Sequence, residues 1–172
     1  MPDHIYLDAS VLVHYALGIN GSPEPGDQNG TQGLQALIDS DARLGASPIT
    51  LAEFSSVMYT KLRDSAGWLA SFDEAAVDRA DAELMCWIAT GRVRIRPLGA
   101  RAFEMGMAYV SSASRQQRKM KAWDAIHLYE ACRWARELDE QVVLATADKD
   151  FTRFVDIFPE FGRQVRLLDT TA

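Results

Sequence analysis

The stretch HIYLDAS, residues 4–10, decides the fold of this chain of 172 residues. Its first five residues favour a β-strand, and Asp8 stands where that strand ends. Four more β-favouring runs alternate with longer helical segments further along the chain. These runs are LGASPI (44–49), RVRIRPL (92–98), QVVLATA (141–147) and QVRLLD (164–169). The alternation predicts βαβ units that build a mostly parallel sheet with helices on both faces.

Helical periodicity fills the segments between these runs. We expect helices near 10–18, 32–42, 50–64, 73–90, 99–113, 120–137 and 149–155. RVRIRPL alternates arginines with apolar residues, a pattern that a strand buried on both faces would not tolerate, so we expect it at an edge of the sheet. Residues 18–33 are rich in Gly, Pro, Asn and Asp, which predicts a mobile loop between two helices.

Composition favours one α/β domain over residues 1–172, since 48% of the residues are hydrophobic and this length can bury one sizeable core. Lys and Arg total 18 against 24 Asp and Glu, so any nucleic-acid site must be local or supplied with cations. Cys86 and Cys132 lack metal-ligand spacing, and we expect both to be buried, reduced thiols of a cytoplasmic protein. No run is long and apolar enough for a membrane span, so we expect no membrane contact.

Several acidic residues stand at positions where a parallel sheet binds ligands. Asp8 lies beyond the carboxyl end of the first strand, although it also suits a cap of the next helix, and Ser10 is close enough to join the same site. Glu53 follows Thr50 at the spacing of a helix capping box, which is its structural alternative. Asp148 follows the strand QVVLATA and is also a candidate helix cap.

Asp124 is the most unusual of the acids, because it lies on the apolar stripe of the helical segment KAWDAIHLYEACRWA (121–135). A salt bridge to the preceding basic segment is one explanation. That segment contributes Arg115, Arg118, Lys119 and Lys121. The other explanation is a cation that waits on the inward side of the helix. His127, one turn later, is expected to be a packed or hydrogen-bonded histidine rather than a ligand.

The four acids, Asp8, Glu53, Asp124 and Asp148, are predicted to converge at one rim of the sheet. Two carboxylates about 5 Å apart repel by roughly 3 kcal/mol at an effective dielectric of about 20, which exceeds the roughly 1 kcal/mol gained by a typical cap. A divalent cation would relieve that repulsion. Oxygen ligands suit Mg²⁺, with Mn²⁺ as the other choice, and such an ion can activate water against a phosphodiester.

These motifs resemble those of the PIN-domain ribonucleases, in particular the VapC-type toxins of bacterial toxin–antitoxin pairs. The matching pieces, in family order, are YLDAS (6–10), TLAEF (50–54), AWDAIHL (122–128) and LATADKDF (144–151). The resemblance implies a three-layer α/β/α sandwich with a central, mainly parallel sheet of about five strands. It also implies Mg²⁺-dependent endonuclease cleavage of RNA, a cognate antitoxin as partner, and a homodimer.

Carried over by position, the resemblance makes Asp8, Glu53, Asp124 and Asp148 the metal-binding and catalytic acids, with Asp150 as the alternative to Asp148. Ser10 and Thr146 become hydroxyls that border the metal. The basic segment holds the best local candidates for RNA contact, because Lys and Arg dominate phosphate binding. Its members are Arg115, Arg118, Lys119 and Lys121.

Two other classes of protein stay open on the sequence. A non-catalytic RNA-binding module could keep the fold without turnover, although all four acids are present. Another Mg²⁺-dependent phosphohydrolase of the parallel-sheet type is the second alternative. A haloacid-dehalogenase-like phosphatase needs a second Asp two residues after the first, where this chain has Ser10, and a receiver domain needs paired acids near its first strand.

Overall fold

The computed structural model describes residues 3–64, 73–154 and 157–171. Its strands are β1 (His4–Leu7), β2 (Arg43–Ala46), β3 (Val93–Ile95), β4 (Val142–Thr146) and β5 (Val165–Asp169). Its first four helices are α1 (Ala9–Ile19), α2 (Pro25–Asp39), α3 (Pro48–Asp64) and α4 (Glu74–Ala89). The later ones are α5 (Ala102–Arg115), α6 (Ala122–Leu138), the 3₁₀ helix η1 (Lys149–Phe154) and α7 (Pro159–Gln164). Residue 155, the last of the predicted helix 149–155, lies outside the described residues.

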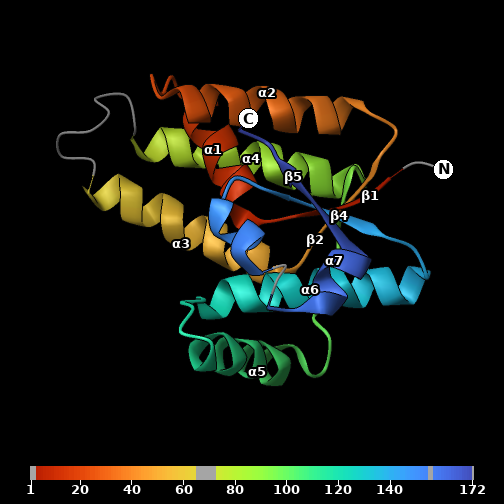
Figure 1. Cartoon of the computed structure of the whole chain (residues 1–172). Coiled ribbons are helices and arrows are strands. Elements are labelled where there is room, and N and C mark those ends of the chain that lie inside the picture. The colour runs from red at the N-terminus through yellow and green to blue at the C-terminus, as the bar shows by residue number, and fades with distance from the viewer. Residues whose placement is uncertain (1–2, 65–72, 155–156, 172) are drawn as a thin grey trace.

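The five strands form one parallel sheet in the order β3-β2-β1-β4-β5 (Figure 1). In the centre, Ile5 of β1 pairs with Leu44 of β2 on one side and with Val143 of β4 on the other. Every residue of β1 and β4 is buried, as expected for parallel strands covered on both faces. The predicted fold class, a three-layer α/β/α sandwich with a mainly parallel five-stranded sheet, is confirmed.

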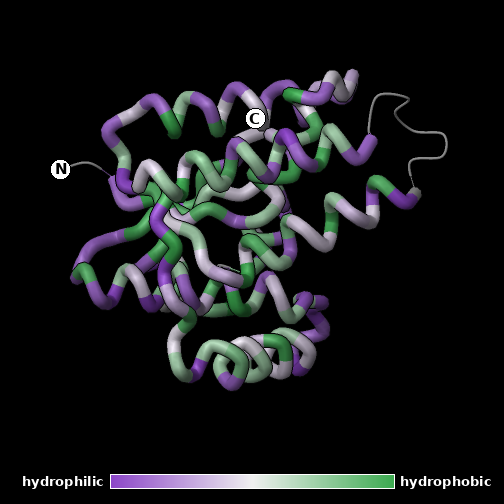
Figure 2. Tube along the Cα trace, turned by 180° about the vertical axis from the view of Figure 1, so that it is seen from behind, coloured by the Kyte–Doolittle hydropathy of each residue, from purple (hydrophilic) through white to green (hydrophobic). Residues whose placement is uncertain are grey.

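Helices cover the two faces of the sheet in separate groups. Helices α1 to α4 lie on one face, and α5, α6 and α7 lie on the other (Figure 1). Each face has its own apolar core: Leu12 and Phe54 belong to the first, and Leu128 and Phe161 to the second. Figure 2 shows hydrophobic residues gathered along the central strands and hydrophilic residues spread along the surrounding helices. None of the helices within the described residues has the length and apolarity needed to cross a membrane.

Strand β3 lies at an edge of the sheet, as RVRIRPL predicted. Val93 is buried and Arg94 is exposed, in line with the expected alternation. Arg92 does not simply face solvent, however. Its guanidinium donates to four backbone carbonyl oxygens at and just after the end of α2, where helix carbonyls lack partners of their own.

The prediction of a mobile loop over residues 18–33 is wrong, because α2 begins at Pro25 and packs along α1. Helix α2 forms despite its glycines because Gly30, together with Gly18 of α1, permits close contact between the two helices. A Cβ on Gly30 would lie 2.6 Å from the His14 Cβ, and one on Gly18 would lie 1.9 Å from the Thr31 Oγ1. The packing of α1 against α2 therefore outweighs the low helix propensity of the glycines.

A buried carboxylate fixes the first turn of α2. Asp27 Oδ1 lies 2.5 Å from Nδ1 of His14 on α1, and Asp27 Oδ2 accepts a hydrogen bond from the hydroxyl of Ser22. Both Asp27 and Ser22 are buried. The contact between Asp27 and His14 needs the folded pair of helices, so the local pattern in residues 18–33 does not announce it.

The two cysteines differ in their surroundings. Cys132 is buried in α6, as predicted, and both thiols are free. Cys86 is exposed, which contradicts the prediction of two buried thiols. The inward face of α4 is taken by Ala76, Val77, Ala80 and Leu84, and helical periodicity turns Cys86 away from them.

Candidate metal centre

The site lies at the carboxyl ends of the central strands, where the order of strands reverses between β1 and β4. Ligands of open parallel sheets bind at such a switch point. Asp8 follows β1 and occupies the cap position of α1, but its side chain makes no capping hydrogen bond to that helix. The cap explanation of Asp8 is therefore wrong, and its buried carboxylate is turned to other partners.

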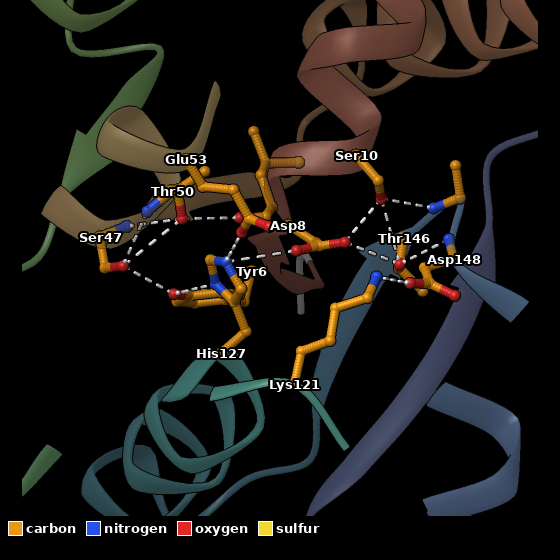
Figure 3. Close-up of polar contacts among 12 residues, drawn as sticks. Tyr6, Asp8, Ser10, Ser47, Thr50, Glu53, Lys121, His127, Thr146 and Asp148 are labelled. Carbon is orange, nitrogen blue, oxygen red and sulfur yellow. Dashed lines mark hydrogen bonds and ion pairs between the residues drawn. The ribbon is translucent and has the colours of Figure 1, made fainter. Parts of the chain in front are cut away.

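Two hydroxyl groups hold the Asp8 carboxylate on one side (Figure 3). The Ser10 Oγ donates to Asp8 Oδ2 at 2.6 Å, and the Thr146 Oγ1 donates to the same oxygen at 2.9 Å. Backbone amides fix the hydroxyls in turn: Ala147 N donates to Ser10 Oγ at 2.9 Å, and Asp148 N donates to Thr146 Oγ1 at 3.0 Å. Ser10 and Thr146 thus border the carboxylate, and Asp8 Oδ1 remains directed toward the other side of the site.

Glu53 reaches the site from the second turn of α3. The capping box predicted from Thr50 and Glu53 does not form, because α3 begins earlier, at Pro48. Ser47 takes the capping role with a hydrogen bond from Thr50 N to Ser47 Oγ at 3.4 Å, while the Thr50 hydroxyl donates to the carbonyl oxygen of Leu7 at 3.2 Å. The Glu53 carboxylate is free of the cap and faces Asp8 across His127 (Figure 3).

His127 is fully buried between these two acids. Its Nε2 lies 2.9 Å from Glu53 Oε2 and 3.4 Å from Asp8 Oδ1, and its Nδ1 lies 3.1 Å from the hydroxyl of Tyr6. Burial lowers the pKa of His127, but the two carboxylates outweigh burial and raise that pKa above its ordinary value. The predicted hydrogen bonding of His127 is confirmed, whereas these contacts do not test the expectation that it is not a metal ligand. Its position at the centre of the site was missed.

Asp124 lies in the first turn of α6 and is only 6% exposed. Its pKa is raised to about 6, chiefly by burial; Lys121 opposes the rise, and the carboxylates of Asp148, Asp8 and Glu53 add to it. The three predicted partners of Asp124 are therefore near enough to influence its charge. Lys121 offsets only part of the effect, so the salt-bridge explanation does not account for this buried acid.

Asp148 and Asp150 have different surroundings. Asp148 Oδ1 accepts a hydrogen bond from Asp150 N at 2.8 Å, and Asp148 Oδ2 lies 3.6 Å from Lys121 Nζ. Asp148 thus caps η1, as one alternative predicted, and still directs one oxygen toward the site. Asp150 is 45% exposed and pairs with Arg153 at 2.8 Å, away from the other acids.

The predicted basic residues lie on the stretch that leads into α6. Arg115, Arg118, Lys119 and Lys121 are all exposed. Lys121 is the member that reaches the acids: Asp124 raises the pKa of its ammonium, burial opposes this shift, and Asp148 adds to the rise. A positive rim, formed by these four residues, therefore borders one side of the acidic cluster.

The donor set fits a divalent cation. Ligand atoms of Asp8, Glu53 and His127 lie within 4.8 Å of one another, and Asp124 and Asp148 bring further carboxylate oxygens nearby. Carboxylate oxygens suit Mg²⁺ and Mn²⁺. Sequence reasoning found the acids but not Tyr6 and Ser47, which support His127 from behind (Figure 3). In the sequence, Tyr6 and Ser47 are recognisable only as polar residues within or directly after a buried strand.

The fold and the acidic pocket together define a parallel α/β/α protein with a candidate metal centre at its switch point. Solved structures share this fold. A chain of FitAcB from Neisseria gonorrhoeae matches with a TM-score of 0.58 and 16% identity, covering 96% of this chain and 97% of that one. A chain of VapBC2 from Rickettsia felis, bound to a DNA fragment from their promoter, matches with a TM-score of 0.56 and 16% identity, covering 96% and 98%.

These matches confirm the predicted fold, which this chain shares with chains of the FitAcB and VapBC2 structures. No family model matches the sequence, and no curated protein matches it. At 16% identity, the likeness is carried by the arrangement of strands and helices rather than by the sequence.

Proposed function

We propose that this protein is a metal-dependent endoribonuclease and the toxin of a toxin–antitoxin pair. The observation that carries the proposal is the convergence of Asp8, Glu53, Asp124 and Asp148, which are separated by up to 140 residues in sequence, around one pocket. Buried carboxylates repel each other unless a cation joins them. A bound cation would offset the repulsion among the four acids, whereas helix caps and salt bridges do not explain why the acids converge.

The chain's own residues would divide the work as follows. Asp8, Glu53, Asp124 and Asp148 hold a divalent ion, Mg²⁺ or Mn²⁺. Ser10 and Thr146 keep Asp8 in place through the hydrogen bonds described above. Once bound, the ion supplies a water of lowered pKa and neutralises charge on the scissile phosphate.

Substrate binding needs positive charge, because the acids would otherwise repel RNA. Lys121 lies beside Asp148 at the edge of the acidic cluster, and Arg115, Arg118 and Lys119, which precede it in the chain, are also exposed. Phosphate groups of single-stranded RNA fit such a rim without any reading of bases. We therefore assign these four residues to the RNA backbone.

The partner would be an antitoxin, as the VapBC2 likeness suggests. A segment of that partner would silence the pocket by covering the acids or by placing an arginine among them. We further propose a homodimer that works in the cytoplasm, where both RNA and Mg²⁺ are abundant.

RNA cleavage by the purified chain tests the proposal. Wild-type protein should cleave single-stranded RNA with Mg²⁺ or Mn²⁺ and stop in EDTA. Asp8→Asn and Asp124→Asn should lose at least about a hundredfold in rate, because each removes a metal-binding charge. Asp39→Asn, an exposed acid at the end of α2, is the matched control and should keep full activity.

Full activity in EDTA, or in either site variant, would refute the mechanism. RNA binding without cleavage and without divalent binding would favour a non-catalytic RNA-binding module instead.

A further inference from the structure

His127 contacts the acidic pocket with one ring nitrogen and a chain of buried hydroxyls with the other. Its Nε2 faces Asp8 and Glu53, while its Nδ1 faces Tyr6 (Figure 3). A neutral imidazole carries one proton, so the nitrogen that holds it decides what the other can bind.

The hydroxyls of Tyr6, Ser47 and Thr50 form a chain that decides which nitrogen of His127 carries the proton. The chain ends at a backbone carbonyl oxygen, which can only accept a hydrogen bond. The Leu7 carbonyl oxygen accepts from the Thr50 hydroxyl at 3.2 Å. The Thr50 oxygen is then left to accept from Ser47 Oγ, 3.4 Å away, and Ser47 Oγ accepts from the Tyr6 hydroxyl at 2.8 Å.

Each hydroxyl in this chain has a single proton, and every proton is used in the direction of Leu7. The Tyr6 oxygen must therefore accept from Nδ1–H of His127, 3.1 Å away. A neutral ring with its proton on Nδ1 has a lone pair on Nε2. That lone pair is directed at the oxygens of Asp8 and Glu53, at 3.4 and 2.9 Å.

Without a metal, a proton on Nε2 relieves the repulsion between that lone pair and the two carboxylates, in agreement with the raised pKa of His127. A cation that displaces this proton would bind the same lone pair together with the two carboxylates. The spacing of the three atoms suits a shared ion, since ligands at right angles with bonds of about 2.1 Å lie about 3 Å apart. A metal-binding histidine also needs a partner on its second nitrogen to hold the ring, and Tyr6 supplies it.

We propose that His127 is itself a metal ligand, so that the centre binds through one imidazole nitrogen as well as through carboxylates. The inference rests on the proposed function, because it concerns the same ion. It has a consequence for metal choice: imidazole contributes more to binding Mn²⁺ and later transition metals than to binding Mg²⁺. The site should therefore prefer Mn²⁺ over Mg²⁺ more strongly than an all-carboxylate site.

Pulsed electron paramagnetic resonance of the Mn²⁺-loaded, full-length protein tests this directly. A directly bound imidazole produces a ¹⁴N modulation in the Mn²⁺ echo, which needs no enzymatic turnover to observe. We expect that modulation in the wild type and its loss in His127→Gln. We also expect His127→Gln to weaken Mn²⁺ binding at least about tenfold and Mg²⁺ binding much less.

The control is His14→Gln, which removes a histidine that contacts the carboxylate of Asp27 in α2. It should leave the ¹⁴N modulation unchanged. Because His127 is buried and its variant is liable to misfold, the wild-type spectrum alone decides the main question. Mn²⁺ bound tightly without ¹⁴N modulation would overturn the role of His127 and leave the proposed nuclease intact. Failure to bind any divalent ion would instead remove the proposed function together with this inference.

Discussion

Replacing Asp124 by Asn should stabilise the metal-free protein at neutral pH. The carboxyl of Asp124 has a pKa of about 6 instead of 3.8, chiefly because it is buried. One pKa unit corresponds to about 1.4 kcal/mol, so the ionised group disfavours the folded state by about 3 kcal/mol, or about 2 kcal/mol once solvent at the open side of the pocket is considered. Asn keeps the shape of the side chain and removes that cost.

The pH dependence follows from the direction of the shift. The folded state holds the Asp124 proton more tightly than the unfolded chain, so the destabilisation is absent below a pH of about 4, grows as pH rises, and is complete above the folded pKa of about 6. The gain in the Asp124→Asn variant should therefore be full at pH 7.5 and about half as large at pH 5.

Urea unfolding in EDTA at both pH values measures this gain. Asp150→Asn, which changes an exposed acid paired with Arg153, is the control and should shift stability by no more than about 0.5 kcal/mol. Mn²⁺ should reverse the order, since an ion at a hundred times its dissociation constant stabilises the wild type by about 2.7 kcal/mol. The reasoning would be refuted if Asp124→Asn were no more stable than the wild type at pH 7.5, or if its gain in unfolding free energy were the same at both pH values.

Three further predictions concern the packing of α2, its last turn and the positive rim. Gly30→Ala should lower the unfolding free energy by about 1–3 kcal/mol, because the added Cβ would collide with His14. Gly26→Ala in the same helix has room for a Cβ and should raise the unfolding free energy by up to about 1 kcal/mol. Urea unfolding measures both. Arg92→Lys should cost about 1–3 kcal/mol in the same assay by leaving carbonyl oxygens after α2 without donors, while Arg94→Lys should cost less than about 0.5 kcal/mol. Lys121→Gln should weaken binding of single-stranded RNA and lower the salt slope of that binding by about one, measured by fluorescence anisotropy; an unchanged slope would remove Lys121 from the RNA contacts.

The sheet could be predicted because its signal is local. Each strand appears as a short apolar or alternating run, and the arginines of RVRIRPL identified the edge. The convergence of the acids followed from one rule, that parallel strands present their carboxyl ends at the same rim. Asp8 and Asp148 illustrate it, since both follow neighbouring strands of the sheet.

The features that sequence reasoning missed depend on contacts between distant segments. Gly18 of α1 and Gly30 of α2 allow the two helices to pack closely. In the sequence alone, glycines in such a segment are typical of a loop. Thr50 and Glu53 matched a capping box, but Ser47 before Pro48 took the cap. The setting of His127 depends on Tyr6, 121 residues away, which no local pattern reveals.

The order of the strands also bears on how the protein is made. Strand β1 leaves the ribosome well before one of its two neighbours, β4, which lies about 140 residues later. Until that segment emerges, the middle of the sheet stays open and Asp148 is not yet available. A chain that stops before β4 therefore lacks the central strand pairing and the assembled cluster of acids.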